Sequence, residues 1–158
     1  MIYFTTFILA IFLSRIARAE PQAFGDVIPP ELPTLVEQFN IPIVEVTYNN
    51  IYDNPNASTK SVTCKNFYPK YPQFQDIFTF PDIGGAFDIL TPGSPNCGKC
   101  WKLINRDNGH SVVITAINHA KHGFDISDAA YKRLDDGHVG PPLKHVEARA
   151  LSSPVCGL

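Results

Sequence analysis

Residues 102–117, with the sequence KLINRDNGHSVVITAI, carry the strongest folding signal in the chain. Two runs rich in aliphatic and β-branched residues, 102–105 and 111–117, flank a turn made by Asp107, Asn108 and Gly109. An Asn-Gly pair between apolar runs is typical of a tight β-hairpin, because both residues tolerate the positive φ angles that such a turn needs. The stretch therefore predicts two antiparallel strands joined by a short turn.

Further short strands and one helix are expected on either side of this hairpin. Alternating apolar and polar residues predict a strand at 44–48 and a last strand at 146–151. Residues 127–134 are the best helix candidate, with Ser127 as N-cap. Residues 83–87 (IGGAF) predict a tight bend where two backbones approach closely. Short strands with Gly and Pro corners favour a mostly β domain closed into a barrel, because closure removes exposed edges.

Size and composition fit one globular domain. The chain has 158 residues, of which 44% are hydrophobic and 18% are charged, and this balance excludes a disordered chain. Lys and Arg number 13 against 15 Asp and Glu, so the formal net charge is −2. A nucleic-acid-binding domain needs a basic footprint, which this composition does not provide. We therefore expect no nucleic-acid partner.

The N-terminus has the features of a targeting segment. Residues 2–13 form an apolar run that is too short to cross a bilayer, which takes about 20 residues. Ala17-Arg18-Ala19 follows as a small-residue cleavage pattern, so residues 1–19 are expected to be a signal peptide that is removed before Glu20. An uncleaved membrane anchor is the alternative. No later stretch is apolar enough for membrane insertion.

The region after the signal peptide is rich in proline. Residues 20–42 contain five prolines and are expected to form an extended leader with at most one helical turn near 35–37, since prolines this dense prevent regular structure. The domain proper is expected to span residues 43–158. Asn56-Ala57-Ser58 is a glycosylation sequon in a predicted surface loop, for which a plain polar loop is the alternative reading.

The four cysteines are expected to be structural. In a secreted chain they should be oxidised in pairs, and the sequence allows three connectivities. Cys97-Gly98-Lys99-Cys100 has the spacing of a redox dithiol, so an extracellular thiol oxidoreductase is one alternative. Residues 101–103 continue as a strand rather than as a helix, which favours disulfide staples. The cysteines are Cys64, Cys97, Cys100 and Cys156.

No other motif points to catalysis, a metal or a cofactor. His119-Ala120-Lys121-His122 lacks the further ligands that zinc requires. A weak polysaccharide hydrolase, which needs two carboxyl groups beside a cleft, is the enzymatic alternative, but no motif selects two. The aromatic residues of 67–80 are expected to cover the core, with stacking on sugar rings as the alternative. The candidate carboxylates are Asp53, Asp82, Asp88, Asp125 and Glu147.

Five ordered blocks of residues carry a resemblance to a known family. They are Val44-x-Val46-x-Tyr48 with Ile51-Tyr52-Asp53-Asn54; Phe80-Pro81-x-Ile83-Gly84-Gly85-Ala86; Ser94-Pro95-Asn96-Cys97-Gly98-x-Cys100-Trp101-x-Leu103; Ala116-Ile117-x-His119-Ala120 with Gly123-Phe124-x-Ile126-Ser127; and Val155-Cys156-Gly157-Leu158. From about Val44 to Leu158, the chain resembles the cerato-platanins, which are small secreted fungal proteins.

The resemblance implies both a fold and a function. The fold would be a six-stranded double-psi β-barrel with one or two short helices and the disulfides Cys64–Cys97 and Cys100–Cys156. The protein would be secreted, extracellular or in the cell wall, and monomeric. It would bind N-acetylglucosamine oligomers (chitin) or another wall polysaccharide, or loosen the wall as expansins do, without catalysis. It would elicit plant defence through a possible plant receptor; recognition by a partner without sugar binding is the alternative.

Three departures from the family pattern affect the expected site. Asn118 and Asn49 stand where the family usually carries Asp, and Thr91-Pro92-Gly93 replaces an aromatic platform. An amide cannot act as a general acid or base, but it can hydrogen-bond a sugar hydroxyl. We therefore expect no catalytic residue. The expected site is a shallow groove, and Asp53 and His119 are alternatively structural turn residues. Its lining residues are Tyr48, Asp53, Asn118 and His119.

Overall fold

The computed structural model describes residues 41–158 of the chain. The predicted signal peptide (1–19) and nearly all of the predicted leader (20–42), including its expected helical turn, lie outside the described residues. Both therefore stay predictions.

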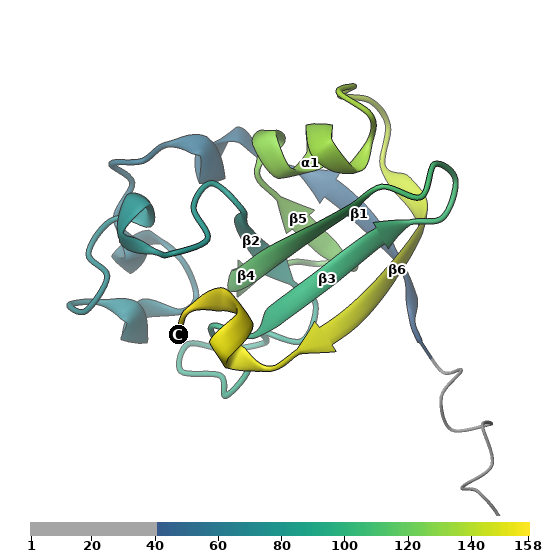
Figure 1. Cartoon of the computed structure of the whole chain (residues 1–158). Helices are drawn as coiled ribbons and strands as arrows, with labels where there is room; N and C mark the ends of the chain where they lie inside the picture. The colour runs from purple at the N-terminus through teal and green to yellow at the C-terminus, as the bar shows by residue number, and fades with distance from the viewer. Residues whose placement is uncertain (1–40) are drawn as a thin grey trace, which may run out of the picture. The chain divides into compact units, whose positions relative to one another are not determined.

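Six strands close into a barrel (Figure 1). The order around the barrel is β1-β5-β2-β4-β3-β6, in which β1–β5 and β2–β4 are parallel and the other pairs are antiparallel. This arrangement confirms the expected six-stranded, mostly β double-psi barrel. The strands are β1 (Ile43–Tyr48), β2 (Ile83–Ala86), β3 (Cys100–Asn105), β4 (Ser111–His119), β5 (Phe124–Ile126) and β6 (Leu143–Leu151).

The hairpin at the centre of the sequence forms as predicted. β3 and β4 pair antiparallel from Cys100↔Thr115 to Ile104↔Ser111, and Gly109 in the turn has a φ of 78°. β4 extends two residues beyond the predicted end at 117, so that Asn118 and His119 belong to the strand. The single helix, α1 (Asp128–Leu134), begins after Ser127, whose hydroxyl accepts a hydrogen bond from the Ala130 N–H at 3.0 Å.

The predicted tight bend at 83–87 is wrong. Residues 83–86 form the extended strand β2, which lies between β4 and β5 in the barrel. The predicted close approach of backbones is confirmed: a Cβ atom on Gly84 would lie 2.5 Å from the Asp125 carbonyl oxygen, and one on Gly85 would lie 2.9 Å from the His119 carbonyl oxygen. The glycines therefore let β2 pack closely against β4 and β5, and they do not reverse the direction of the chain.

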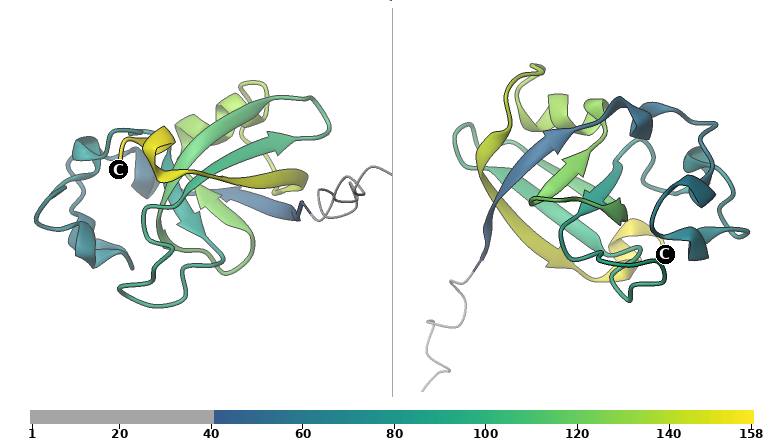
Figure 2. Two further views of the ribbon diagram at one scale, coloured as in Figure 1. Left: turned by 60° about the horizontal axis from the view of Figure 1, so that its bottom comes forward. Right: turned by 180° about the vertical axis from the view of Figure 1, so that it is seen from behind.

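The core has two parts. The first fills the barrel and lies under α1, with residues such as Val46, Leu103, Ile114 and Tyr131. The second lies under the excursion, which we define as residues 49–82 between β1 and β2 and which projects to one side of the barrel in both views of Figure 2. The excursion contains the 3-10 turns η2 (Asn50–Asp53), η3 (Thr59–Ser61), η4 (Lys65–Phe67) and η5 (Phe74–Asp76); a fifth, η6 (Ser153–Cys156), follows β6.

The aromatic residues of the excursion divide between core and surface. Phe67 and Phe74 are buried, which agrees with the expected role in covering the core. Phe78 is 77% exposed and Tyr68 is 40% exposed, so these two rings face solvent.

The disulfides are Cys64–Cys97 and Cys100–Cys156, as the resemblance implied. Cys97 and Cys100 are thus bridged to other partners, which removes the redox-dithiol alternative. Cys64–Cys97 ties the excursion to the loop before β3, and Cys100–Cys156 ties β3 to η6. The loop-entropy model gives roughly 4 kcal/mol of stabilisation for each closed loop of this length.

The carboxyl of Glu147 generates a prediction about acid stability. Glu147 is 5% exposed and forms ion pairs with Arg149 and Arg106, and these hydrogen bonds lower its pKa. A carboxyl with a lowered pKa in the folded state stabilises the protein above its unfolded pKa of about 4.3, and this contribution is lost as the pH falls through the folded pKa. We expect Glu147→Gln to lower the urea-unfolding midpoint at pH 7. The difference in midpoint between this variant and the parent protein, here called the gap, should shrink below pH 4. An equal gap at both pH values would contradict this.

The packing at Gly84 generates a second prediction. Gly84→Ala should destabilise the oxidised protein by about 3 kcal/mol, because the new methyl group meets backbone atoms that cannot move aside. Urea unfolding measures the change. Gly140→Ala is the matched control, since nothing lies within 4 Å of a Cβ atom there, and it should change stability by less than about 0.5 kcal/mol. Equal effects at the two positions would refute the packing argument.

Candidate functional site

Polar residues form a row across four neighbouring strands. Thr47 on β1 pairs with Asp125 on β5, Asp125 pairs with Gly85 on β2, and Gly85 pairs with Asn118 on β4. Residues paired across strands present their side chains to the same face of a sheet. We call Thr47, Asp125, Gly85 and Asn118 the polar row. Because Gly85 has no side chain, only bare backbone lies between Asp125 and Asn118 in the row.

The Asp125 carboxylate is held by neighbouring donors. The Thr47 hydroxyl donates to its Oδ1 at 2.9 Å, and the Asn49 side-chain amide donates to its Oδ2 at 3.5 Å. Asp125 is half-buried. A carboxylate has about four lone-pair sites, so both oxygens keep capacity to accept hydrogen bonds from a ligand.

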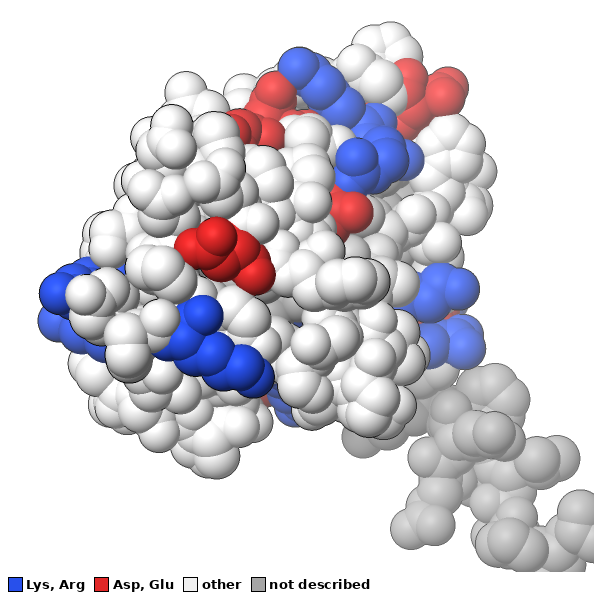
Figure 3. Space-filling view, turned by 60° about the vertical axis from the view of Figure 1, so that its left-hand side comes forward, with Lys and Arg blue, Asp and Glu red and all other residues white. Residues whose placement is uncertain are grey.

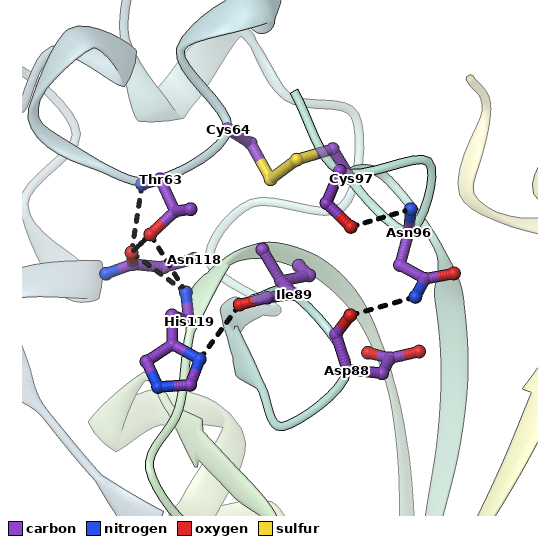
Figure 4. Close-up of a disulfide and its surroundings, with 9 residues drawn as sticks. Thr63, Cys64, Asp88, Ile89, Asn96, Cys97, Asn118 and His119 are labelled. Carbon is purple, nitrogen blue, oxygen red and sulfur yellow. Dashed lines mark hydrogen bonds between the residues drawn. A yellow bond between two sulfur atoms is a disulfide. The ribbon is translucent and has the colours of Figure 1, made fainter. Parts of the chain in front are cut away.

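Asn118 is fixed by four hydrogen bonds, three of which are drawn in Figure 4. Its Oδ1 accepts from the Thr63 N–H at 2.9 Å, the Thr63 hydroxyl at 2.7 Å and the His119 N–H at 2.9 Å. Its Nδ2 donates to the Tyr52 hydroxyl at 3.0 Å. An amide nitrogen carries two hydrogens, so one N–H remains for a ligand. Asn118 is therefore a positioned donor whose carbonyl oxygen is already occupied.

Tyr52 lies behind the polar row, and both Asn118 and Asp125 affect the pKa of its phenol. Burial raises the pKa of its phenol to about 12; the hydrogen bond from Asn118 opposes the rise, and the negative charge of Asp125 adds to it. The phenol therefore stays protonated at neutral pH, and its own proton can be donated.

His119 lies on the surface beside the row. Its Nδ1 is 2.8 Å from the Ile89 carbonyl oxygen, an acceptor, so Nδ1 carries the proton and Nε2 faces away as an acceptor in the neutral ring (Figure 4). His119, Thr47 and Asp125 line a depression of about 300 Å³. Glu45, Ala120, Lys121 and His122 complete its lining.

A second depression adjoins the first. It has a volume of about 410 Å³, shares Glu45, Lys121 and His122 with the first and is also lined by Phe87. The Phe87 ring is 38% exposed and packs edge-on against Phe124 with ring centroids 5.9 Å apart. The two depressions together form a groove with polar groups at one end and an aromatic side chain at the other. We call this the polar-row groove.

Of the four predicted site residues, only His119 lines the two depressions; Asn118 precedes it on β4, and Tyr48 and Asp53 contact α1. The Tyr48 ring, 41% exposed, packs on Tyr131 of α1 with centroids 5.0 Å apart. The Asp53 carboxylate accepts the backbone N–H groups of Asp128 (2.8 Å) and Ala129 (3.0 Å) at the start of α1. Neither residue lines the depressions beside His119. The helix contacts favour the structural alternative for Asp53, and a ligand contact by either residue stays a prediction.

Sequence reasoning missed Thr47, Tyr52 and Asp125 as site residues. Thr47 is the outward residue of the predicted strand at 44–48, and Asp125 was one of several isolated carboxylates. The polar position between Phe124 and Ile126 is the signal that could have selected Asp125, because two buried neighbours make it the outward residue of a strand.

The remaining predictions concern metals, membranes and glycosylation. Residues 41–158 contain no group of three or more His, Cys, Asp or Glu side chains arranged to hold a metal ion. The only α-helix of the described part, α1, has seven residues, and no helix there could cross a membrane. Asn56 of the sequon is exposed in the turn after η2, so its modification stays a prediction.

The fold and the site define a class: a small, two-disulfide β-barrel with a polar row across four neighbouring strands. The family model of cerato-platanin matches residues 44–157. The chain is 32% identical over 120 residues to the heat-stable 19 kDa antigen of Coccidioides immitis, covering 72% of this chain and 81% of the antigen. It is 40% identical over 98 residues to allergen Asp f 15 of Aspergillus fumigatus, covering 60% of this chain and 63% of the allergen.

A solved structure agrees with these sequence relatives. The solution structure of the fungal elicitor cerato-platanin superposes with a TM-score of 0.66 at 29% identity, covering 72% of this chain and 96% of that chain. The chain belongs to the cerato-platanin family. None of the relatives' names denotes an enzyme.

The environment of Tyr52 generates a testable prediction. In an ultraviolet titration of the folded protein, the Tyr52 phenol should ionise near pH 12, about two units above its value in the urea-unfolded chain. Tyr52→Phe should remove part of the late-ionising absorbance. Burial also raises the pKa of Tyr131 to about 12, so late absorbance will remain in that variant. An unchanged late fraction in Tyr52→Phe would contradict the assignment.

Proposed function

We propose that this protein is a secreted, non-catalytic carbohydrate-binding protein that takes N-acetylglucosamine oligomers or a related neutral wall polysaccharide in the polar-row groove. One observation carries the proposal. The row presents a fixed carboxylate, Asp125, opposite a fixed amide donor, Asn118, on the same face. Acceptors and donors held in place in this way suit the hydroxyl and acetamido groups of sugars.

The chemistry of the row favours binding over hydrolysis. Hydrolysis of a glycosidic bond requires two carboxyl groups, one on each side of the bond. The row contains one carboxylate, that of Asp125. Asn118, on the other side of Gly85, carries an amide, which cannot transfer a proton as an acid or base. Glu45, the other acid at the groove, is paired with Lys144. The expansin-like alternative, wall loosening without cleavage, needs the same groove and is tested with it.

The names of the relatives support a role outside the cell. An antigen, an allergen and an elicitor are all proteins met by another organism. Two disulfides are also typical of an oxidising compartment. We accordingly place this protein in the extracellular space or the cell wall, and recognition by a plant receptor is part of the proposal.

The test is a titration of the oxidised, ¹⁵N-labelled protein with chitotriose, followed by backbone amide shifts. Saturable shifts are expected around Thr47, Asn118 and Asp125. Asp125→Asn should weaken binding about tenfold, because hydrogen bonds to a charged acceptor are worth more than those to a neutral one. Tyr48→Ala tests the stacking contact predicted from the sequence.

Asp107→Asn is the matched control, since this carboxylate lies in the exposed β3–β4 turn beside His145. It should leave the affinity unchanged. A folded protein without saturable shifts, or an Asp125→Asn variant that binds as well as the parent, would overturn the proposed site. New reducing ends released from chitin by the parent protein would instead favour the hydrolase alternative.

A further inference from the structure

One stretch within the excursion carries three positive charges and no negative one, although Asp53, Asp76 and Asp82 balance them over residues 49–82 as a whole. Residues 54–75 contain Lys60, Lys65 and Lys70 and no Asp or Glu. Residues 41–158 as a whole contain 11 basic and 11 acidic residues, so the local excess does not reflect a basic domain. Figure 3 faces this side of the molecule, where blue side chains at the lower left lie on mostly uncharged surface with one red group directly above them.

These lysines lack the ion pairs that hold most other cations of the described part. Lys99, Lys132 and Lys144 each pair with a carboxylate, and so do the three arginines between residues 41 and 158. None of the three lysines of 54–75 takes part in an ion pair within that same range. Their charge is therefore available to an anionic ligand.

Two of the three ammonium groups are held against tyrosine rings. Lys60 Nζ lies 3.8 Å from the centroid of the Tyr68 ring, and Lys70 Nζ lies 4.8 Å from the centroid of the Tyr71 ring. Cation–π attraction limits the positions of these otherwise flexible side chains. In such a pair, the ammonium group can bind a carboxylate of a ligand, and the aromatic ring can contact the apolar face of a ligand's ring.

A cavity of about 330 Å³ opens beside Lys70 and Tyr71. The Phe67 ring forms one wall and packs edge-on against Tyr71 with centroids 5.7 Å apart. A Cβ atom on Gly98 would lie 3.1 Å from the Phe67 ring, so the glycine keeps this wall open. Asn66 and Ser153, both exposed, add an amide and a hydroxyl to the lining. We call this cavity the Lys–Tyr pocket.

We propose that the Lys–Tyr pocket binds an acidic sugar, a uronic acid residue of a wall polysaccharide. Its carboxylate would contact Lys70 Nζ, its ring face would lie on Tyr71, and its hydroxyls would meet Asn66 and Ser153. The volume is at the lower end of the range for small-molecule sites, which suits one or two sugar rings. The Lys60–Tyr68 pair repeats the same combination for a further residue of an acidic polymer.

The chemistry of the surface favours this ligand over other polyanions. Nucleic acids carry a dense line of phosphates and are bound by extended basic surfaces, whereas this domain is neutral overall. Binding to an anionic membrane draws on clusters of four to eight basic residues, and this surface has three. A polyuronate carries one charge per sugar together with hydroxyl groups, which matches isolated lysines beside polar side chains.

The Lys–Tyr pocket shares no lining residue with the polar-row groove. The inference therefore goes beyond the proposed function and can fail independently of it. If both sites operate, one molecule can contact a neutral and an acidic polysaccharide at the same time.

The test uses the oxidised, ¹⁵N-labelled protein with three sugar probes: trigalacturonate, its methyl ester and chitotriose. Single-stranded DNA and phosphatidylserine vesicles are added separately as competing polyanions. Trigalacturonate alone should shift the amides of Asn66, Gly98 and Ser153 in a saturable manner, and added salt should weaken its binding. Lys70→Gln should weaken binding about tenfold, because a charge-assisted hydrogen bond is lost. Lys102→Gln is the matched control: this lysine also lacks an ion pair in the described part and lies on β3 between two buried residues.

Several outcomes would overturn the inference. Equal binding of the methyl ester would mean that the carboxylate is not recognised. An equal loss in Lys102→Gln and Lys70→Gln would indicate unspecific charge attraction. Shifts at these amides from single-stranded DNA or from phosphatidylserine vesicles, with trigalacturonate inactive, would assign the surface to a different partner. Chitotriose shifts around Asn118 report on the proposed function separately.

Discussion

The two adjacent glycines of β2 set how closely the strands of the barrel approach one another. Gly84 and Gly85 let β5 and β4 approach closer than any side chain would allow. That approach closes the barrel through its shortest strands. It also brings Asp125 on β5 and Asn118 on β4, two strands that β2 separates in the barrel, to the same face with only backbone between them. The geometry of the barrel and the geometry of the groove thus have one origin.

The excursion supplies the residues that orient Asn118. Thr63 and Tyr52 come from this segment and hold the Asn118 amide from both ends. The Cys64–Cys97 bridge directly follows Thr63, so the covalent attachment of the excursion lies one residue from the contact that orients the site. The same bridge lies beside the Lys–Tyr pocket. Both candidate surfaces therefore rely on a segment with no barrel strand, whose shape is set by 3-10 turns, buried aromatic rings and a disulfide.

Local signals predicted a closed, mostly β barrel, the family resemblance implied its six strands and disulfide pairs, and the site could be predicted only in part. The Asn-Gly hairpin, the Ser127 N-cap and the alternation in β1 act over a few residues, so they are visible in one sequence. A bend was wrongly predicted at residues 83–87 because two adjacent glycines are compatible both with a bend and with a strand that packs closely on its neighbours. Only the strand's pairing partners distinguish the two. Asp125 and Thr47 were missed for a related reason: strand register brings them together, and register has no local signature. The blocks shared with the family pointed to Asn118 and His119 and to the disulfide partners.

The hydrogen bonds at Asn118 have an evolutionary consequence. Three donors converge on one side-chain oxygen, and a carboxylate oxygen at that place would satisfy them equally well. Asparagine and aspartate codons differ by a single base. An aspartate at this position is thus one nucleotide away, and the three donors that hold the oxygen need no compensating change. A single base change can therefore switch this position between a neutral donor and a second acid beside Asp125 within the same hydrogen-bond network.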